Sequence, residues 1–220
     1  MYKTKKTSRA ASLFLSVVLL LLTPCVAAAE NSENLSRFND VLPGQWYYSA
    51  IEYVAERGYF NGVSDDTFAP GTPMTRAMFV TALGRMAGVD PTAYPDSGFL
   101  DVLPESYYSG YVAWAVETGI VQGVSDSLFG PGANITREQI AVFLYRYAQH
   151  IGMDVSIGQT AQPHIIDGED IVSPWAMTAM VWANNRGIMK GTSNGMEPQA
   201  EATRAQVAQM LCNFDRLTDN

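Results

Sequence analysis

Cysteine, histidine and lysine are scarce in this 220-residue sequence, and each shortage excludes a class of protein. Of the two cysteines, Cys25 lies in an N-terminal segment that we expect to be removed. No intramolecular disulfide is therefore expected, and Cys212 should be a buried thiol. His150 and His164 have no cysteine or carboxylate at the spacing of metal ligands. We accordingly expect neither a metal ion nor another cofactor.

The N-terminal segment has the three parts of a secretory signal peptide. Four basic residues precede an apolar run over residues 10–22, and Ala27, Ala28 and Ala29 follow it, which predicts cleavage after Ala29. The alternative is a lipoprotein signal that uses Cys25, although Pro24 stands where such signals favour a small residue. The apolar run is too short to span a bilayer comfortably, and no later stretch comes closer. We expect an exported protein without a stable membrane span.

Positive charge is also scarce. Removing residues 1–29 takes away four basic and no acidic residues, which lowers the formal net charge from −8 to −12 and leaves Lys190 as the single lysine. Without a basic run, the chain lacks the electrostatic footprint of a protein that binds nucleic acid or an anionic membrane surface. Any anion that it binds must be held at specific sites.

Three copies of one pattern fill the chain after a short polar leader at residues 30–37. The copies cover residues 38–88, 99–148 and 165–214. Thr75 and Thr136 are equivalent and lie 61 residues apart, and Thr203 follows 67 residues after Thr136. The first two copies align without gaps, whereas the third has an irregular opening. The repetition predicts one cooperative domain.

The second half of each repeat predicts an amphipathic helix. Apolar residues recur at the spacing i, i+3, i+4 and i+7, which forms one buried face of a helix. They are Phe79, Ala82, Leu83, Met86; Ile140, Phe143, Leu144, Tyr147; and Val207, Met210, Leu211, Phe214. The predicted N-caps are Thr75, Thr136 and Thr203. Gln139 and Gln206 can complete a capping box, whereas Met78 cannot, so the first of these helices should start less firmly.

A shorter helix is predicted in the first half of each repeat, over residues 46–57, 107–118 and 174–186. Gly58, Gly119 and Gly187 are the expected C-terminal stops, and Ser173 before Pro174 is the expected start in the third copy. Since a two-helix unit cannot bury both of its faces alone, the three units should pack together. The predicted fold class is all-α, with three helix-loop-helix repeats in one bundle.

An arginine follows the capping threonine in every copy: Arg76, Arg137 and Arg204. This first helical position favours negative charge, because of the helix dipole and the free N–H groups. Three recurrences suggest a positive pocket in which a guanidinium and unpaired backbone donors converge on a bound anion. The alternative is that each arginine pairs with a carboxylate of a neighbouring repeat.

The repeats resemble the S-layer homology family. The resemblance covers residues 38–214 and rests on the Phe-x-Asp opening, the Trp- or Tyr-led first helix, the Gly-Ile-Val-x-Gly turn, the Phe-x-Pro loop and the Thr-Arg start of the second helix. It implies a pseudo-threefold assembly at the bacterial cell wall that binds secondary cell-wall polysaccharide by pyruvylated, anionic sugar ends in grooves between repeats. It also implies that the three motif arginines contact the ligand. Where the family has Glu at the fourth motif position, this chain has Met78, Gln139 and Gln206.

Aromatic residues recur at the start of each first helix. Trp46, Tyr107 and Trp175 have two alternative roles, since they could stack on sugar rings or belong to the core. Trp114 and Trp182 are expected in the core.

Aspartates also recur, in two sets. Asp65 and Asp126 lie on the loop nearest the Thr-Arg motif and either accept hydrogen bonds from sugar hydroxyls or serve a turn. Asp40, Asp101 and Asp167 precede the first helices, where a turn or capping role is expected.

Catalysis is not expected. Ser64 and Ser125 lack the glycine pattern and the histidine partner of a nucleophile elbow, and a glycosidase needs one dedicated carboxylate pair rather than a threefold array. We therefore predict a non-catalytic wall-binding module. The alternative is a protein-binding helical scaffold at the cell surface that contacts other surface-layer proteins.

Overall fold

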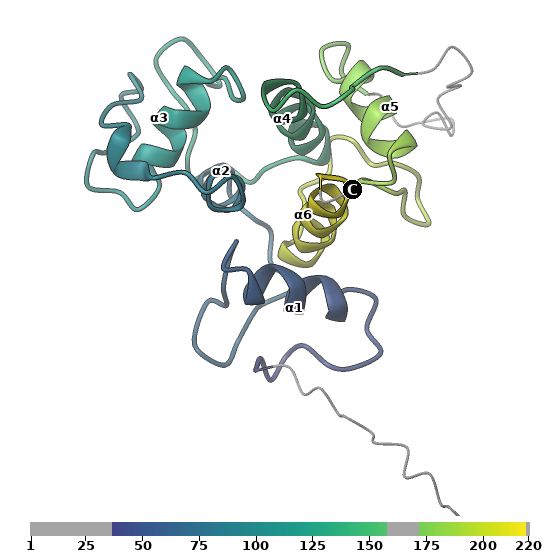
Figure 1. Ribbon diagram of the computed structural model, residues 1–220. Coiled ribbons are helices and arrows are strands. Elements are labelled where there is room, and N and C mark those ends of the chain that lie inside the picture. The colour runs from purple at the N-terminus through teal and green to yellow at the C-terminus, as the bar shows by residue number, and fades with distance from the viewer. Residues whose placement is uncertain (1–36, 158–171, 219–220) are drawn as a thin grey trace, which may run out of the picture. The chain divides into compact units, whose positions relative to one another are not determined.

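The computed structural model describes residues 37–157 and 172–218. The predicted signal peptide, residues 30–36 of the leader and Asp167 lie outside these residues. Within them the chain forms six α-helices and one short 3-10 helix, and no strand, which confirms the all-α fold class (Figure 1). In order they are α1 (Tyr48–Glu56), α2 (Arg76–Met86), η1 (Pro91–Ala93), α3 (Ser109–Glu117), α4 (Arg137–His150), α5 (Met177–Asn185) and α6 (Arg204–Thr218). None of these helices is long and apolar enough to cross a membrane.

Helices α2, α4 and α6 begin at the predicted caps. The hydroxyl of Thr75 accepts a hydrogen bond from the N–H of Met78, at 3.2 Å. At α4 the hydroxyl of Thr136 accepts from the N–H of Gln139, and the Gln139 side chain accepts in return from the N–H of Thr136, both at 3.3 Å. Thr203 and Gln206 form the same box at α6. Thr75 therefore caps α2 without the reciprocal bond of a capping box, and the lower stability expected of this first start stays a prediction.

Helices α1, α3 and α5 begin two or three residues later than predicted, at Tyr48, Ser109 and Met177. A turn precedes each helix, and no side chain caps it. The prediction that Ser173 caps α5 is wrong. Its N–H and its hydroxyl donate instead to the carboxylate of Glu138 in α4, at 3.0 and 2.9 Å. The glycine stops are confirmed, because each of the three has a φ near +70° that other residues rarely adopt: Gly58, Gly119 and Gly187.

The helices pair between repeats rather than within them. Helix α2 packs against α3, α4 against α5, and α6 against α1 (Figure 1). The second helix of each repeat thus lies on the first helix of the next repeat, and the pair α6 and α1 joins the last repeat to the first. Every repeat therefore depends on a neighbour for its buried faces, and the order of contacts closes on itself instead of running as a linear solenoid.

The predicted apolar faces form the core of these pairs. Eleven of the twelve predicted positions are buried, and Met86 is the exception. Trp114 and Trp182 are 4% and 0% exposed, which confirms their place in the core. Cys212 is also buried, and burial raises the pKa of its thiol.

A ring of three backbone hydrogen bonds links the repeats just before the capping threonines. The N–H of Met74 donates to the carbonyl of Ala202, that of Ala202 to Ile135, and that of Ile135 back to Met74, each at 2.9 Å. All three side chains are buried. This cycle holds the starts of α2, α4 and α6 together.

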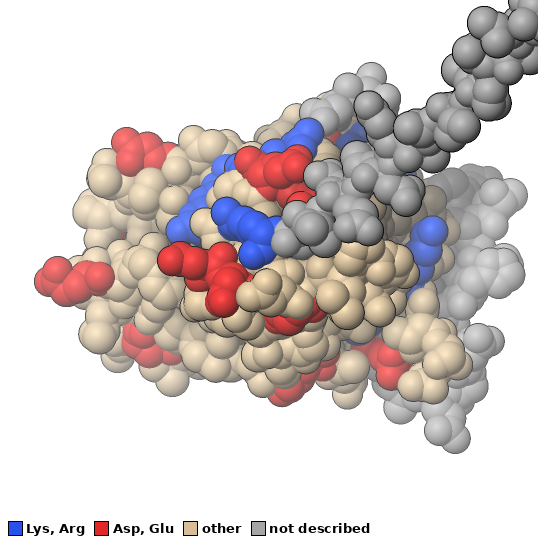
Figure 2. All heavy atoms as spheres, turned by 90° about the horizontal axis from the view of Figure 1, so that it is seen from below, with Lys and Arg blue, Asp and Glu red and all other residues tan. Residues whose placement is uncertain are grey.

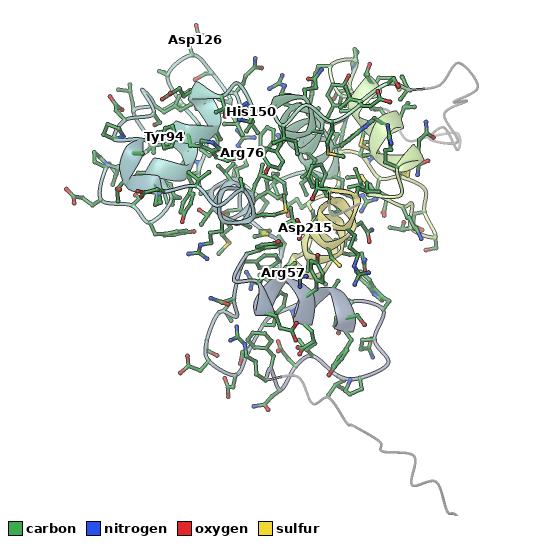
Figure 3. All side chains as sticks on the ribbon, viewed as in Figure 1. Arg57, Arg76, Tyr94, Asp126, His150 and Asp215 are labelled. Atoms are coloured by element: carbon green, nitrogen blue, oxygen red, sulfur yellow. The ribbon has the colours of Figure 1, made fainter. Side chains whose placement is uncertain are left out.

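The α6–α1 pair carries a polar cluster around Asp215 (Figure 3). The carboxylate of Asp215 accepts hydrogen bonds from the hydroxyls of Tyr53, at 3.0 Å, and Tyr59, at 2.5 Å. The Nε of Arg57 lies 3.7 Å from the same carboxylate. Burial and the hydrogen bond to Asp215 raise the pKa of Tyr59 above its usual range. These contacts tie the first helix of the described chain to the last.

Candidate functional site

The motif arginines are buried at the junctions between repeats. Arg76, Arg137 and Arg204 are only 2–4% exposed. The guanidinium of Arg76 donates from Nε to the carbonyl of Phe129, at 3.0 Å, and from Nη2 to that of Gln122, at 2.9 Å. Both acceptors belong to the next repeat.

The other two arginines make the same contacts. Arg137 donates to the carbonyls of Met196 and Lys190, both at 2.8 Å. Arg204 donates to those of Phe68, at 2.8 Å, and Asn61, at 2.6 Å. Each motif guanidinium thus donates to two backbone carbonyls of a neighbouring repeat. The three positive charges therefore sit at fixed points, one at each junction.

The first-turn N–H groups of these helices are also occupied. The N–H of Arg76 donates to the carbonyl of Ala133, at 2.9 Å, and that of Ala77 to Pro131, at 3.2 Å. Equivalent bonds occupy the first two N–H groups of α4 and α6. The prediction of unpaired backbone donors facing an anion is wrong, because the loop after each Phe-x-Pro segment places its carbonyls on the helix start of the preceding repeat.

Two aspartates brace the loops that receive the arginines. The carboxylate of Asp101 accepts from the N–H groups of Phe129 and Gly130, both at 2.8 Å. Asp40 does the same for Phe68 and Ala69. The predicted turn or capping role before the first helices is wrong for this pair, because both carboxylates bond backbone N–H groups 28 and 29 residues later in the chain and no side chain caps α1 or α3. Burial lowers the pKa of Arg76 to about 10, although the charge of Asp101 acts in the opposite direction.

A groove with a volume of about 570 Å³ opens beside Arg137 and is lined by all three repeats. Repeat 1 contributes Trp46, repeat 2 contributes Arg137, and repeat 3 contributes the turn with Lys190 and one side of α6. The polar residues on that side are Gln206, Gln209 and Asn213. We call this the Lys190 groove. It combines an exposed aromatic ring, two cations and several amides.

Trp46, Tyr107 and Trp175 lie at the surface. Their exposed fractions are 61%, 60% and 59%, so the alternative that they belong to the core is wrong. The ring of Trp46 is held edge-on by Tyr47, with centroids 5.2 Å apart, and Tyr107 stands in the same way against Tyr108, at 5.1 Å. Trp46 and Tyr107 therefore form matching aromatic surfaces, each packed edge-on against its neighbour.

Two further clusters repeat the composition of the Lys190 groove. Tyr107 lies within electrostatic range of Arg85 and Arg204; burial raises the pKa of its hydroxyl, and these two charges lower it. We call these residues, with Asn61, the Arg85 cluster. We call Arg76, Gln122 and Arg146 the Arg146 cluster. Arg76 donates to the Gln122 carbonyl, and Arg146 donates to the Gln122 side chain at 3.3 Å. Trp175 occupies the place in the third repeat that Trp46 occupies in the first, and by this equivalence we expect it beside the Arg146 cluster.

Asp65 and Asp126 do not line the groove. Both are exposed, and Figure 3 shows Asp126 at the outer end of its loop, directed away from Arg76. Asp66 organises the first of these loops instead, since its carboxylate accepts from the hydroxyls of Ser64 and Thr67. A ligand role for Asp65 and Asp126 stays a prediction.

Sequence reasoning missed the second cations: Arg85, Arg146 and Lys190. Lys190 could have been found from the sequence, because it is the single lysine after residue 29 and lies at a fixed place in the family turn. For the two arginines, only the alignment of α2 with α4 reveals that they match.

The surface has no large positive region on the face shown in Figure 2. Acidic side chains are scattered over much of it, and the basic ones form only a few small patches. In the described residues, no group of three or more His, Cys, Asp or Glu side chains could hold a metal ion. On this face the positive charge available to a ligand is therefore local.

Comparison with known proteins identifies the family. The family model of the S-layer homology domain matches residues 37–78, 98–141 and 169–208, which together make up more than half of the chain. The chain therefore belongs to the S-layer homology domain family and carries three tandem repeats.

Similar proteins include cell-surface proteins and enzymes that are much longer than this chain. An endoglucanase of Bacillus sp. (strain KSM-635) is 29% identical over 214 residues, which cover 95% of this chain and 22% of that protein. S-layer protein EA1 of Bacillus anthracis is 25% identical, over 91% of this chain and 22% of its own length. The surface-layer 125 kDa protein of Lysinibacillus sphaericus is 27% identical, over 96% and 17%. The chain spans about a fifth of these relatives, and the family together with the S-layer proteins identifies it as an anchoring module of the cell surface.

Proposed function

We propose that this chain is a non-catalytic module that holds its carrier on the cell wall by binding secondary cell-wall polysaccharide through anionic, pyruvylated sugar ends. One observation carries the proposal. Trp46, Arg137 and Lys190, from three different repeats, line one groove. A ligand that fits this groove needs a flat apolar face and a negative charge within a few ångströms of each other. A sugar that carries a carboxylate ketal has both.

The aromatic ring supplies the surface on which a sugar can stack. Trp46 is 61% exposed yet fixed in orientation by its edge contact with Tyr47. A rigid aromatic side chain gives a large contact area at a low cost in conformational entropy. The amides of Gln206, Gln209 and Asn213 then lie in the same groove and can exchange hydrogen bonds with sugar hydroxyls.

The cations supply the selection for an anion. Lys190 is exposed at the groove, and its ammonium can donate a charge-assisted hydrogen bond to a carboxylate. Arg137 acts differently, because two of its donors are already bonded to carbonyls. Its buried charge is less screened by solvent and salt than a surface charge, and it raises the local potential of the groove. We propose the same role for Arg76 and Arg204.

The capping threonines have an indirect part in this proposal. Thr75, Thr136 and Thr203 are half-buried and fix the helix starts from which the arginines leave. Their hydroxyls are occupied as caps, so their contribution to binding is to position the arginines.

A second function, a protein-binding scaffold at the cell surface, has one observation in its favour. Leu42 and Leu103 occupy matching positions in the first two repeats and are 58% and 64% exposed. Val63 and Val124 form a second matched pair, both 58% exposed. Repeated exposed apolar side chains are typical of protein contacts.

Co-sedimentation with protein-free cell-wall sacculi separates the two functions. The test variant replaces Trp46, Tyr107 and Trp175 by alanine, and the control variant replaces Leu42 and Leu103, which are similarly exposed. The aromatic residues of the groove and of both clusters must be changed together, because avidity on a wall conceals the loss of one site. We expect the wild type and the leucine variant to sediment, and the aromatic variant to remain in solution while keeping its helical circular dichroism. A wild type that stays in solution with protein-free sacculi would favour the scaffold.

A further inference from the structure

We propose that each of the three sites uses two cations to bind its anionic ligand. In the Lys190 groove the second cation stands at a different position of the repeat from its counterparts at the other two sites, while the charge of the site is the same. The inference rests on the proposed function. It assigns the second cation to Lys190 in the groove, to Arg85 in the Arg85 cluster and to Arg146 in the Arg146 cluster.

Two positions in each repeat hold the second cation and an amide side chain. The first is the residue before the second glycine of the turn, which is Asn61, Gln122 or Lys190. The second lies ten residues after the capping threonine, and it is Arg85, Arg146 or Asn213 in the same order of repeats. Each repeat therefore has one amide and one cation at the two positions, and only the third repeat has them reversed.

The contacts place the two positions side by side. In the second repeat, Arg146 on α4 donates to the side-chain oxygen of Gln122 on the turn, at 3.3 Å. In the third repeat, Lys190 and Asn213 line one groove. The side chain of Asn213 donates to the carbonyls of Gly187 and Ile188, both at 3.1 Å, and so supports the turn that carries Lys190. The amide and the cation are thus neighbours whichever of the two positions carries the charge.

The buried arginine is constant at all three sites and bonds the backbone of the first position. Arg204 donates to the carbonyl of Asn61, Arg76 to that of Gln122 and Arg137 to that of Lys190. Each site therefore has one cation that cannot move and one more that is solvent-accessible or half-buried. In a chain with a formal charge of −12 after residue 29, a preserved pair of cations at each site indicates a ligand that is negatively charged.

The chemical consequence is a difference between sites. A guanidinium at Arg85 or Arg146 offers a planar fork to a carboxylate, whereas the ammonium of Lys190 is a flexible point charge. The Lys190 groove should therefore accept a carboxylate in more orientations, while the other two sites should be more selective in geometry.

The experiment relocates the charge. The probe is methyl glucopyranoside with a 4,6-pyruvate ketal, and its uncharged methyl ester is the control ligand. Binding is followed by the indole N–H signals of the four tryptophans in heteronuclear NMR spectra of the protein after signal-peptide removal. Trp46 reports the Lys190 groove, and Trp175, at the equivalent place in the third repeat, is the proposed reporter of the Arg146 cluster, while the buried Trp114 and Trp182 report the integrity of the core.

Lys190→Gln should weaken ketal binding at Trp46 by about tenfold and leave Trp175 unchanged. The double variant Lys190→Gln/Asn213→Arg rebuilds the arrangement of the second repeat, and it should restore affinity at Trp46 to within about threefold of wild type. Asn213→Ala in the wild-type background measures how much the turn depends on Asn213. The reciprocal double variant Gln122→Lys/Arg146→Asn, read at Trp175, tests the same exchange without altering Asn213.

The outcomes are distinct. Unchanged binding in Lys190→Gln overturns the assignment of the second cation. If both double variants lose ketal binding while the Trp114 and Trp182 signals are unaltered, the proposed exchange of positions is overturned. If the wild type binds the acid and the methyl ester equally, or binds neither, the proposed function itself fails.

Discussion

Replacing Arg137 by alanine should destabilise the protein as well as alter its site. The guanidinium makes two charge-assisted hydrogen bonds of 2.8 Å to the carbonyls of Met196 and Lys190, and the residue is 2% exposed. Hydrogen bonds to charged groups contribute about 1.5–3 kcal/mol each, and a carbonyl left without a partner in a buried place costs a similar amount. Relief of the buried charge offsets part of this loss.

We therefore expect Arg137→Ala to lower the free energy of unfolding by about 3 kcal/mol. In a domain of this size, 1 kcal/mol corresponds to about 2–4 °C in the melting temperature, so the expected decrease is about 6–12 °C. Differential scanning calorimetry measures it directly. Arg85→Ala is the matched control, since it removes one positive charge from an exposed side chain and should change stability by less than about 0.5 kcal/mol.

Arg137→Lys should fall between wild type and alanine, because an ammonium keeps the charge but cannot reproduce the two-pronged contact. Melting temperatures for Arg137→Ala and Arg85→Ala that agree within 2 °C would refute the reasoning, because the carbonyl contacts would then contribute nothing. A wall-binding assay on an arginine-to-alanine variant is informative only when its stability has been measured first.

Three other predictions can be tested with single or paired variants. Thr136→Ala should cost about 1 kcal/mol in chemical denaturation, because α4 loses its capping box, and Thr75→Ala should cost at least as much; no change in either would contradict the capping assignment. Tyr59→Phe should remove a loss of stability that the wild type shows at alkaline pH. The folded pKa of Tyr59 is raised above the ordinary value of 10, so the stabilisation that depends on its proton is complete below pH 10 and is lost as the pH rises further. The difference in unfolding free energy between wild type and Tyr59→Phe should thus shrink above pH 10, and a constant difference would contradict it. Met78→Gln should raise the melting temperature by one or two degrees by completing the first capping box, and an unchanged value would show that lost packing of Met78 offsets the new bonds.

The repetitive part of the fold could be predicted from the sequence, since local patterns determine it. The i, i+3, i+4, i+7 spacing and the caps at Thr136 and Thr203 depend on neighbours in the chain, and both predictions are confirmed. The starts of α1, α3 and α5 were placed too early, because nothing local distinguishes the preceding turn from a first helical turn. Glu138 recruits Ser173 from 35 residues away.

The environment of the motif arginines could not be predicted in the same way. Arg76 meets carbonyls 46 and 53 residues later in the chain, and periodicity carries no information about which repeat will supply them. The exposure of Trp46, Tyr107 and Trp175 was equally open, because an aromatic before a helix can face either way. The sequence shows only that Lys190 is rare, and a binding role becomes evident from the groove that it lines with Trp46 and Arg137.

The most direct test of the central claim is the sedimentation of the wild-type protein with protein-free sacculi before and after the pyruvate ketals have been removed. The formal net charge of −12 after residue 29 gives no general attraction to a negatively charged wall, so the proposed binding depends on a specific anionic group held by local cations. We predict that it sediments with intact sacculi, that raised salt weakens this binding because Lys190, Arg85 and Arg146 are solvent-accessible or half-buried, and that it remains in solution with sacculi stripped of ketals. Equal sedimentation with both preparations would contradict the anion model and leave stacking on Trp46, Tyr107 and Trp175 as the basis of binding.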